Sequence, residues 1–492
     1  MLRSPSSALS RRLLPPTPRA RPSTLTAPFG GSRGFASSAA REKQRLLILG
    51  TGWGGYEVLR TVDKSRYDVT VVSPNTYFAF TPLLASAAVG TIDFNSALEP
   101  VRKAKFRQTK YFQAWVDGID LDRKRLTCMP ATGSAFRKRI NASISDPVVD
   151  EAVGPASSFP GYKPFEMQYD KLVIAVGAYS QTFNTPGVKE HAYFLKDIRD
   201  SAKIRARILE CFELASQPTV SDIERKNLLN FVIVGGGPTG VEFAGELHDF
   251  LTSDLQRAFP TLAPLARLTL YDVAAGILGN FDASLAEFAT EKFKREGIRI
   301  KGNHHVTAVH EAHLEIKEEG RVPYGLLVWS TGLAPNPFIE HVGKALQHDE
   351  KTKSLTVNDH FNPTTNDGKV RDDIFVIGDC SSLASKLPAT AQVASQEARH
   401  LSKILNAQVR NRDPPGPFQY NNRGVMAYVG GWNAVVDRTT ADKGPQGELT
   451  GRAAWLAWRS AYWSQAMSFR NKVSLVYHWF TTWMLGRRLT RF

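Results

Sequence analysis

The sequence has 492 residues, of which 62 are Lys or Arg and 47 are Asp or Glu, so its formal net charge is +15. With 42% hydrophobic and 22% charged residues, it has the composition of a globular protein of two or three domains, which excludes a wholly disordered chain. Cys128, Cys211 and Cys380 are far apart, so we expect no disulfide framework, no local zinc or iron–sulfur site and no metal ligands. No stretch reaches the roughly 18 consecutive apolar residues of a transmembrane helix.

The N-terminal segment differs in composition from the rest. Residues 1–41 contain seven Arg and eight Ser but neither Asp nor Glu, which is typical of a mitochondrial transit peptide. The sequence RGFAS at residues 33–37 resembles a matrix-protease site, so we predict a transit peptide over residues 1–35. The alternative is a disordered basic tail.

A glycine-rich turn follows the first predicted strand. Residues 45–49 form a short apolar run, the motif GTGWGG follows at 50–55, and an amphipathic helix and a second strand at 69–72 come next. This order predicts a dinucleotide site in which the helix N-terminus faces a pyrophosphate. The expected contacts are Gly50, Gly52, Trp53, Gly54 and Gly55. The second strand ends in Ser73 rather than in an acid.

The same unit recurs later in the chain. A strand at 231–234 leads into GGGPTG and a helix, and the partner strand at 268–271 ends in Asp272. A carboxylate there accepts a hydrogen bond from a ribose 2′-OH and repels a 2′-phosphate, so this unit should prefer NADH to NADPH. The residues expected to bind this dinucleotide are Gly235, Gly236, Gly237, Pro238, Thr239, Gly240 and Asp272.

Three further strand-then-glycine segments suggest how the two units are joined. Two of them, ending in Gly177 and Gly332, are typical of crossovers between domains, and the third ends in Gly378 and Asp379. Asp379 is expected to bind a ribityl hydroxyl of a flavin, with a helix N-cap as the alternative. We therefore predict an α/β fold with two Rossmann-like domains: a flavin domain at 45–224 and 346–430, and a nicotinamide domain at 225–345.

The C-terminal region, 431–492, combines aromatic residues with one sign of charge. From residue 449 onward there are seven basic residues, no acid and five of the nine tryptophans. Two stripes at helical spacing, Trp455–Trp458–Tyr462 and Leu475–Trp479–Trp483, predict amphipathic helices that lie on a membrane surface and contact anionic lipid. The alternative is a helical hairpin packed on its own protein or on a second subunit in a homodimer.

Together these motifs resemble the type II NADH dehydrogenases, single-subunit NADH:quinone oxidoreductases of mitochondria and bacteria. The resemblance implies non-covalent FAD, NADH as donor, ubiquinone as acceptor and no proton pumping, and it places Ser73, Pro74, Thr81 and Pro82 on the flavin side. The segments that carry it are LGTGWGG, VSPNTYFAFTPLL, YDKLVIAVGA, GGGPTGVEFAGEL, VPYGLLVWSTG, FVIGDC, AQVASQE and the C-terminal WRSAYW…SFRNKVSLVYHWFTTWMLGRRLTRF.

The resemblance also implies catalytic roles for three residues. Gln392 and Gln396 correspond to quinone-site glutamines, and their i, i+4 spacing places both amides on one helix face; ordinary surface amides are the alternative. Glu242 corresponds to the acid near the nicotinamide–flavin contact, where it orients the nicotinamide or relays a proton. Its alternative is a first-turn acid that complements the helix dipole.

The sequence argues against two rival functions and indicates a location in the cell. A sulfide:quinone oxidoreductase needs working cysteines, and a flavoprotein similar to apoptosis-inducing factor would use its positive charge to bind nucleic acid, whereas here the charge gathers at the two ends of the chain. No calcium-binding loop of the type found in some external family members is present. We therefore expect a peripheral protein on the matrix face of the mitochondrial inner membrane, which binds no nucleic acid. Residues 130–165, a polar excursion, receive no role.

Overall fold

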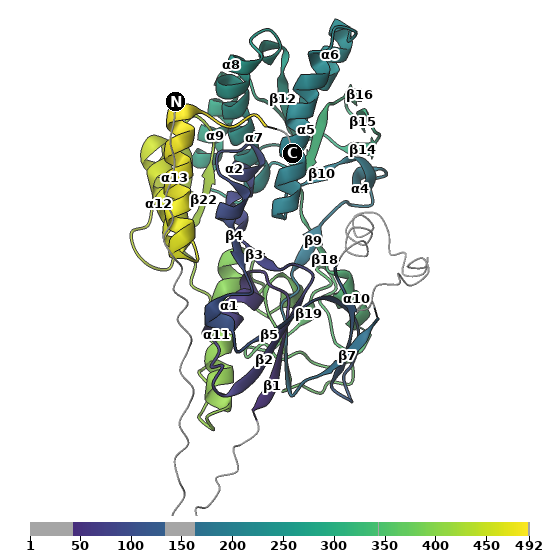
Figure 1. The fold of residues 1–492 in the computed structure, drawn as a ribbon, viewed down its shortest axis with the longest axis vertical. Helices are drawn as coiled ribbons and strands as arrows, with labels where there is room; N and C mark the ends of the chain where they lie inside the picture. The colour runs from purple at the N-terminus through teal and green to yellow at the C-terminus, as the bar shows by residue number, and fades with distance from the viewer. Residues whose placement is uncertain (1–42, 133–162, 343, 491–492) are drawn as a thin grey trace, which may run out of the picture. The chain divides into compact units, whose positions relative to one another are not determined.

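The structure is a computed structural model, and it describes residues 43–132, 163–342 and 344–490. The predicted transit peptide and most of the 130–165 excursion lie outside these residues. From Lys43 onward the chain forms a single compact unit. Its sheets, helices and C-terminal hairpin are shown in Figure 1.

The larger sheet is built around β1, whose residues from Leu46 to Leu49 are buried. Five strands run parallel and two antiparallel strands extend one edge. Helices α1 (Trp53–Thr61) and α11 (Ala391–Gln408) pack against each other beside it. The order is β20 (Ile374–Val376), β8 (Lys171–Ile174), β1 (Gln44–Leu49), β2 (Tyr67–Ser73), β5 (Lys110–Asp120), β6 (Arg125–Pro130) and β7 (Phe165–Gln168).

A second sheet contains five parallel strands. Its edge strand β10 precedes residue 225, where the sequence predicts the start of the nicotinamide domain. Between its strands the chain forms helices α5 (Ile198–Ala215), α6 (Asp222–Leu228), α7 (Pro238–Phe250) and α9 (Ala283–Arg295). The strand order is β10 (Tyr193–Phe194), β17 (Leu326–Trp329), β11 (Asn230–Val234), β12 (Arg267–Tyr271) and β13 (Arg299–Lys301).

Smaller elements surround the two sheets. A three-stranded antiparallel sheet, β14 (Val306–Val309), β15 (His313–Ile316) and β16 (Gly320–Pro323), follows β13 in the chain. The short helices are α2 (Leu84–Ala88), α4 (Val188–His191), α8 (Gln256–Ala258) and α10 (Pro337–Val342), and short strand pairs are formed by β3 (Tyr77–Ala79) with β4 (Leu98–Pro100) and β19 (Leu355–Thr356) with β21 (Ser381–Ser382).

The chain crosses twice between the two sheets. After β8 it passes Gly177 into β9 (Ala178–Ser180), and after β17 it passes Gly332 into β18 (Leu333–Pro335). These two connections pair antiparallel. The segments ending in Gly177 and Gly332 are therefore crossovers, as the sequence predicts.

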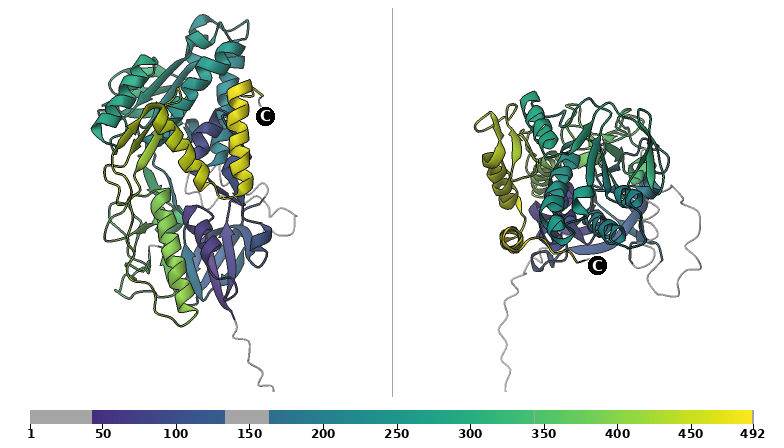
Figure 2. Two further views of the ribbon diagram at one scale, coloured as in Figure 1. Left: turned by 90° about the vertical axis from the view of Figure 1, so that its left-hand side faces the viewer. Right: turned by 90° about the horizontal axis from the view of Figure 1, so that it is seen from above.

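The C-terminal part forms a small sheet and two helices. Strands β22 (Val425–Tyr428), β23 (Ala434–Asp437) and β24 (Glu448–Thr450) lead into α12 (Gly451–Gln465) and α13 (Phe469–Leu485), which lie side by side in Figures 1 and 2. None of the helices in the described part of the chain has both the length and the apolar character needed to cross a membrane.

Two expectations for this hairpin are wrong in detail. The stripe that contains Trp458 and Tyr462 does not face outward: Trp458 is only 3% exposed and packs on β22 and β23, because that face of α12 covers a sheet. Arg487 does not point to lipid either, because its guanidinium forms buried ion pairs with Glu246 and Asp254, at 3.5 and 2.8 Å.

Candidate functional site: two glycine turns and a buried carboxyl group

In the first glycine turn, a side chain would clash with the backbone at the outer glycines, whereas the centre of the turn has free space next to it. A Cβ on Gly50, which has φ +97°, would lie 2.3 Å from the Ala175 carbonyl oxygen, and a Cβ on Gly55 would lie 2.1 Å from the oxygen of Gly50. By contrast, no atom of the described residues lies within 4 Å of a Cβ placed on Gly52. Gly52 is the N-cap of α1 and Trp53 its first residue. The uncovered N–H groups of this helix end suit a phosphate group.

The second glycine turn repeats this arrangement. A Cβ on Gly235, at φ +115°, would lie 2.6 Å from the Ser330 oxygen, and one on Gly240 would lie 2.0 Å from the oxygen of Gly235. A Cβ on Gly237 would meet no described atom within 4 Å. Gly237 is the N-cap of α7 and Pro238 its first residue. In each turn, therefore, the glycine at the helix N-cap, Gly52 or Gly237, is the one left open to a ligand.

Asp272 lies beside the second turn. Its carboxylate accepts hydrogen bonds from the Gly236 N–H and, at 2.7 Å, from the Ala274 N–H. These two contacts hold the side chain at the rim of the turn, where the sugar next to a bound pyrophosphate would lie. Thr239 is exposed in the first turn of α7.

Ser73 occupies the corresponding place beside the first turn. Its hydroxyl oxygen lies 2.9 Å from the hydroxyl oxygen of Thr51 in a buried position. The next residue, Pro74, accepts a hydrogen bond from Gln113 through its carbonyl oxygen, at 3.2 Å. The first unit thus has a pair of neutral hydroxyl groups where the second has a carboxylate.

The predicted flavin segment containing Thr81 lies against α1. The Trp53 indole N–H donates to the Thr81 hydroxyl at 3.0 Å. The Trp53 ring also meets Phe78 edge to face, with 5.0 Å between the ring centroids. Pro82 lies in the single-turn helix that begins at Thr81. The structure therefore brings the glycine turn and this segment together.

Gly378 and Asp379 are held by two residues that sequence reasoning missed. The Gly378 N–H donates to Glu397 at 2.6 Å, and burial raises the pKa of Glu397 to about 8. The ammonium group of Lys196 lies 3.9 Å from the Asp379 carboxylate, and burial lowers the pKa of Lys196. Glu397 ends the AQVASQE motif, so a signal was present. Lys196 follows the two-residue strand β10 and carries no sequence signal.

Glu242 is buried in α7, with 8% of its surface exposed. Its Oε1 accepts hydrogen bonds from the Trp458 indole N–H at 3.0 Å and from the Tyr428 N–H at 3.2 Å. Burial raises the pKa of Glu242 to about 8, so most of this carboxyl group is protonated at neutral pH. Glu242 is the fifth residue of α7 and lies beyond its first turn, so the alternative of a first-turn acid that complements the helix dipole does not fit this position.

Gln392 and Gln396 share one face of α11 and bind the same backbone segment, residues 420–424. The Gln392 amide oxygen accepts from the Arg423 N–H at 2.8 Å, and the Gln396 amide oxygen accepts from the Asn421 N–H at 3.0 Å. This segment leads into β22, whose last residue, Tyr428, contacts Glu242. One short strand therefore connects the two glutamines with the buried acid.

The surroundings of the cysteines do not favour thiol chemistry. All three lie in described segments, and all are free and buried. Burial raises the pKa of Cys128, Cys211 and Cys380 to about 12, 11 and 12, so each remains a neutral thiol.

Comparison with known proteins decides the family. The model of the pyridine nucleotide-disulphide oxidoreductase family matches residues 44–398, and the model of the NDH2 C-terminal domain matches residues 422–488. The chain belongs to the type II NADH dehydrogenase family. This confirms the resemblance that the sequence motifs carry and the α/β fold predicted from them.

Similar proteins match almost the whole length of the chain. A Dictyostelium discoideum protein named "Probable NADH dehydrogenase" is 38% identical over 92% of each chain. The "External NADH-ubiquinone oxidoreductase 2, mitochondrial" of Saccharomyces cerevisiae is 35% identical over 91% of this chain and 82% of its own. The solved structure of NDH2 from Plasmodium falciparum in complex with NADH covers 91% of this chain and 100% of its own, with 25% identity and a TM-score of 0.79.

Proposed function

We propose that this protein is a rotenone-insensitive NADH:ubiquinone oxidoreductase, which oxidises NADH through bound FAD and reduces a membrane quinone without pumping protons. The observation that carries the proposal is the pair of glycine turns, each open at its N-cap glycine, in a chain whose relatives are named NADH- or NAD(P)H-ubiquinone oxidoreductases. A sulfide:quinone oxidoreductase is not favoured, because the thiols are buried and neutral. A flavoprotein similar to apoptosis-inducing factor is not favoured either, because the relatives of the chain are named NADH- or NAD(P)H-ubiquinone oxidoreductases.

The residues of the larger sheet fit FAD. The open turn around Gly52 suits the pyrophosphate, and Asp379 suits a ribityl hydroxyl. Gly177, which has φ +68°, adds a further surface clear of described atoms within 4 Å. FAD, when bound, supplies the hydride-accepting and electron-donating chemistry that no side chain has.

The second unit fits NADH as substrate. The turn at Gly237 would hold the pyrophosphate, and the Asp272 carboxylate would accept a hydrogen bond from the adenosine 2′-OH. The same carboxylate would repel the 2′-phosphate of NADPH. Correct placement of the nicotinamide lowers the barrier mainly by removing the entropic cost of orientation.

Glu242 would hold the proton that the overall reaction consumes. Reduction of a quinone to a quinol needs two electrons and two protons, and NADH supplies the two electrons with only one proton equivalent. The carboxyl group of Glu242 carries a proton at neutral pH beside Trp458. Gln392 and Gln396 lie at the other end of strand β22. They would give up their hydrogen bonds to residues 420–424 and form hydrogen bonds with the quinone carbonyls instead.

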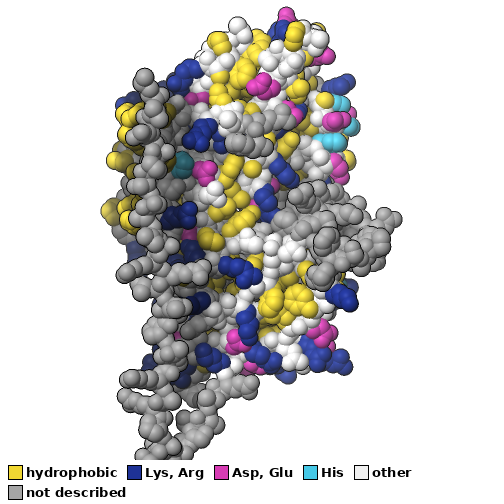
Figure 3. Space-filling view, in the orientation of Figure 1, with side chains coloured by type: hydrophobic (Ala, Val, Ile, Leu, Met, Phe, Trp, Pro, Cys, Tyr) yellow, Lys and Arg dark blue, Asp and Glu magenta, His cyan; other side chains and the backbone are white. Residues whose placement is uncertain are grey.

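The outer face of the C-terminal hairpin would attach the protein to the mitochondrial inner membrane, on the matrix side. Figure 3 shows hydrophobic side chains along the margin where Figure 1 places α12 and α13. The exposed apolar residues there are Leu456, Trp463, Phe469, Val473, Val476, Tyr477, Phe480, Trp483, Met484 and Leu485. A second copy of the chain is the alternative occupant of this face.

Steady-state kinetics test the activity. The purified protein, containing FAD, should reduce a short-chain ubiquinone with NADH and much more slowly with NADPH. If NADH supports no quinone reduction, the proposed function is wrong; if NADPH works equally well, only the role of Asp272 is wrong.

Vesicle flotation tests the membrane surface. Phe480→Ser combined with Trp483→Ser should abolish binding to vesicles containing an anionic lipid, whereas Ile223→Ser on α6, which is 73% exposed, should leave binding unchanged. A wild-type protein that sediments as a dimer and does not bind vesicles would assign the face to a second copy.

Protease treatment of mitochondria with ruptured outer membranes should leave the protein intact if it faces the matrix.

A further inference from the structure

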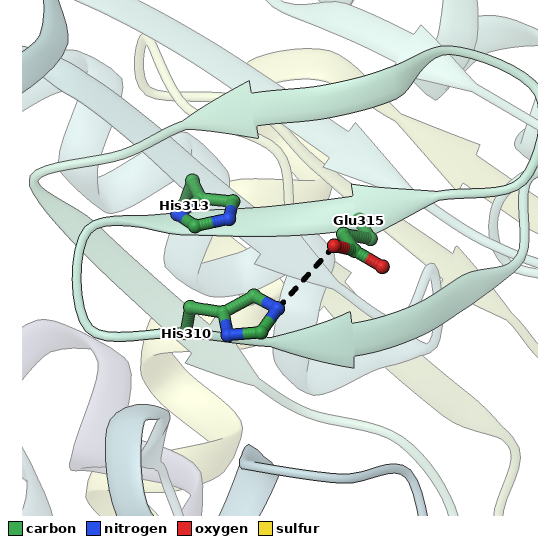
Figure 4. A group of neighbouring side chains, drawn as sticks. All are labelled: His310, His313 and Glu315. Atoms are coloured by element: carbon green, nitrogen blue, oxygen red, sulfur yellow. Dashed lines mark ion pairs between the residues drawn. The ribbon is translucent and has the colours of Figure 1, made fainter.

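Three metal-binding side chains meet on the hairpin formed by β14 and β15. His310 follows β14, while His313 and Glu315 lie on β15 (Figure 4). Leu314 and Ile316 alternate with them and are buried. Because successive side chains of a strand point to opposite faces, His313 and Glu315 share the outer face of the hairpin.

The distances between these groups approach those of a zinc site. The ring nitrogen Nε2 of His310 lies 3.4 Å from Oε1 of Glu315, and one ligand atom from each of the three residues lies within 4.8 Å of the others. Tetrahedral Zn²⁺ with bonds of about 2.0–2.1 Å separates its ligand atoms by about 3.4 Å. One edge of the tetrahedron is therefore already formed, and partly exposed imidazole rings can rotate to form the others.

The two imidazole rings of the group lie face to face. His310 and His313 stack with 4.5 Å between their ring centroids. Two stacked rings would repel each other if both were protonated, but a shared cation would use a neutral nitrogen from each.

We propose that His310, His313 and Glu315 bind a divalent transition-metal ion of the Zn²⁺ class, with water completing the coordination. Two imidazole nitrogens and one carboxylate favour Zn²⁺, Co²⁺ or Ni²⁺ over the harder Mg²⁺ and Ca²⁺. None of these three residues belongs to the proposed redox site. The bound ion would stabilise the turn that joins β14 to β15. Val309 and Leu314, on the two sides of this turn, belong to a buried cluster that also contains Tyr271.

Two neighbouring histidines provide a matched control. His304 and His305 each contact their own carboxylate, Glu319 at 3.1 Å and Glu318 at 2.9 Å, and do not belong to the three-residue group. Substitution of His305 therefore removes an exposed imidazole from the same region without touching the proposed site.

Metal titration of the full-length holoenzyme, without a polyhistidine tag and freed of metal by a chelator, tests the proposal. Calorimetry with Zn²⁺ and visible absorption with Co²⁺ should give one ion per chain. His313→Ala should weaken affinity by at least about tenfold, while His305→Ala should not change it. Binding should also weaken at pH 5.5, because protons compete for the imidazoles.

Thermal unfolding gives a second measurement. Excess Zn²⁺ should raise the Tm of the wild type but not that of the His310→Ala/His313→Ala variant, because a ligand stabilises only the state that binds it. Equal Zn²⁺ affinity in the wild type and the double variant, or no saturable binding in the wild type, would overturn the proposal.

Discussion

The hydrogen bond between Trp458 and Glu242 should control a pH limit of the enzyme. The indole N–H, 3.0 Å from the carboxyl oxygen, lowers the pKa of Glu242 and so opposes the effect of burial. Trp458→Phe removes this donor and keeps an aromatic ring. A hydrogen bond to a charged group is worth about 1.5–3 kcal/mol, so the pKa of Glu242 should rise from about 8 by roughly one to two pH units.

The assay is the pH dependence of kcat for quinone reduction. If Glu242 must hold a proton, the wild-type rate should fall near pH 8, and the fall should move to higher pH in Trp458→Phe. Glu242→Gln should lose that limb of the profile, and Trp455→Phe, on the same helix, should leave it in place. An alkaline limb at one pH in the wild type, Trp458→Phe and Glu242→Gln would refute the reasoning.

The same carboxyl group should make stability depend on pH. Its pKa is about 8 in the folded protein against 4.5 for the ordinary side chain, so the native state binds the proton more tightly than the unfolded state. The stabilisation is complete below pH 4.5 and is lost as the pH rises through about 8. Urea unfolding of Glu242→Gln should show a smaller loss of stability over this interval.

Further substitutions test the glycine turns, the C-terminal tail and the nucleotide preference. Gly52→Ala should fold but retain less FAD, whereas Gly55→Ala should fail to fold or have a much lower Tm. The reason is that only the Cβ on residue 55 would clash with the backbone, at 2.1 Å from the Gly50 oxygen. The flavin content and the Tm of both variants check this prediction, and a stable Gly55→Ala variant would contradict it. Arg487→Met should lower the free energy of unfolding by about 3–5 kcal/mol, because the buried Glu246 carboxylate loses its ion pair, although Asp254 keeps its ion pair with Arg257. Exposed Arg488→Met should change the free energy little in the same urea titration. Asp272→Ala should raise kcat/KM for NADPH relative to NADH, and an unchanged ratio would remove Asp272 from nucleotide selection.

The glycine turns could be predicted because their signals are local. A strand, a turn with four glycines and a helix follow one another directly, and Asp272 comes at the end of the next strand of the second unit. Backbone proximity at Gly55 or Gly240 follows directly from that order, as the structure shows. The two crossovers were also predictable, since each is a buried strand followed by glycine.

The contacts that the sequence could not predict join distant segments. Helical spacing identifies two apolar stripes on α12 and α13 but does not say which of them covers the protein, so Trp458 was assigned to the wrong face. Arg487 belongs to a basic segment, and its acidic partner Glu246 is 241 residues away. Lys196 reaches Asp379 from a short loop with no periodic pattern.

The bond between α7 and α12 has a consequence for how the enzyme is made. Glu242 precedes Trp458 by 216 residues. During synthesis, Glu242 therefore leaves the ribosome long before Trp458, which covers it in the folded protein. Until α12 has docked, the Glu242 carboxyl group would face water and titrate as an ordinary glutamate. Glu242 would therefore acquire its proposed role only at the end of folding, and incomplete chains would contain the acid without its environment.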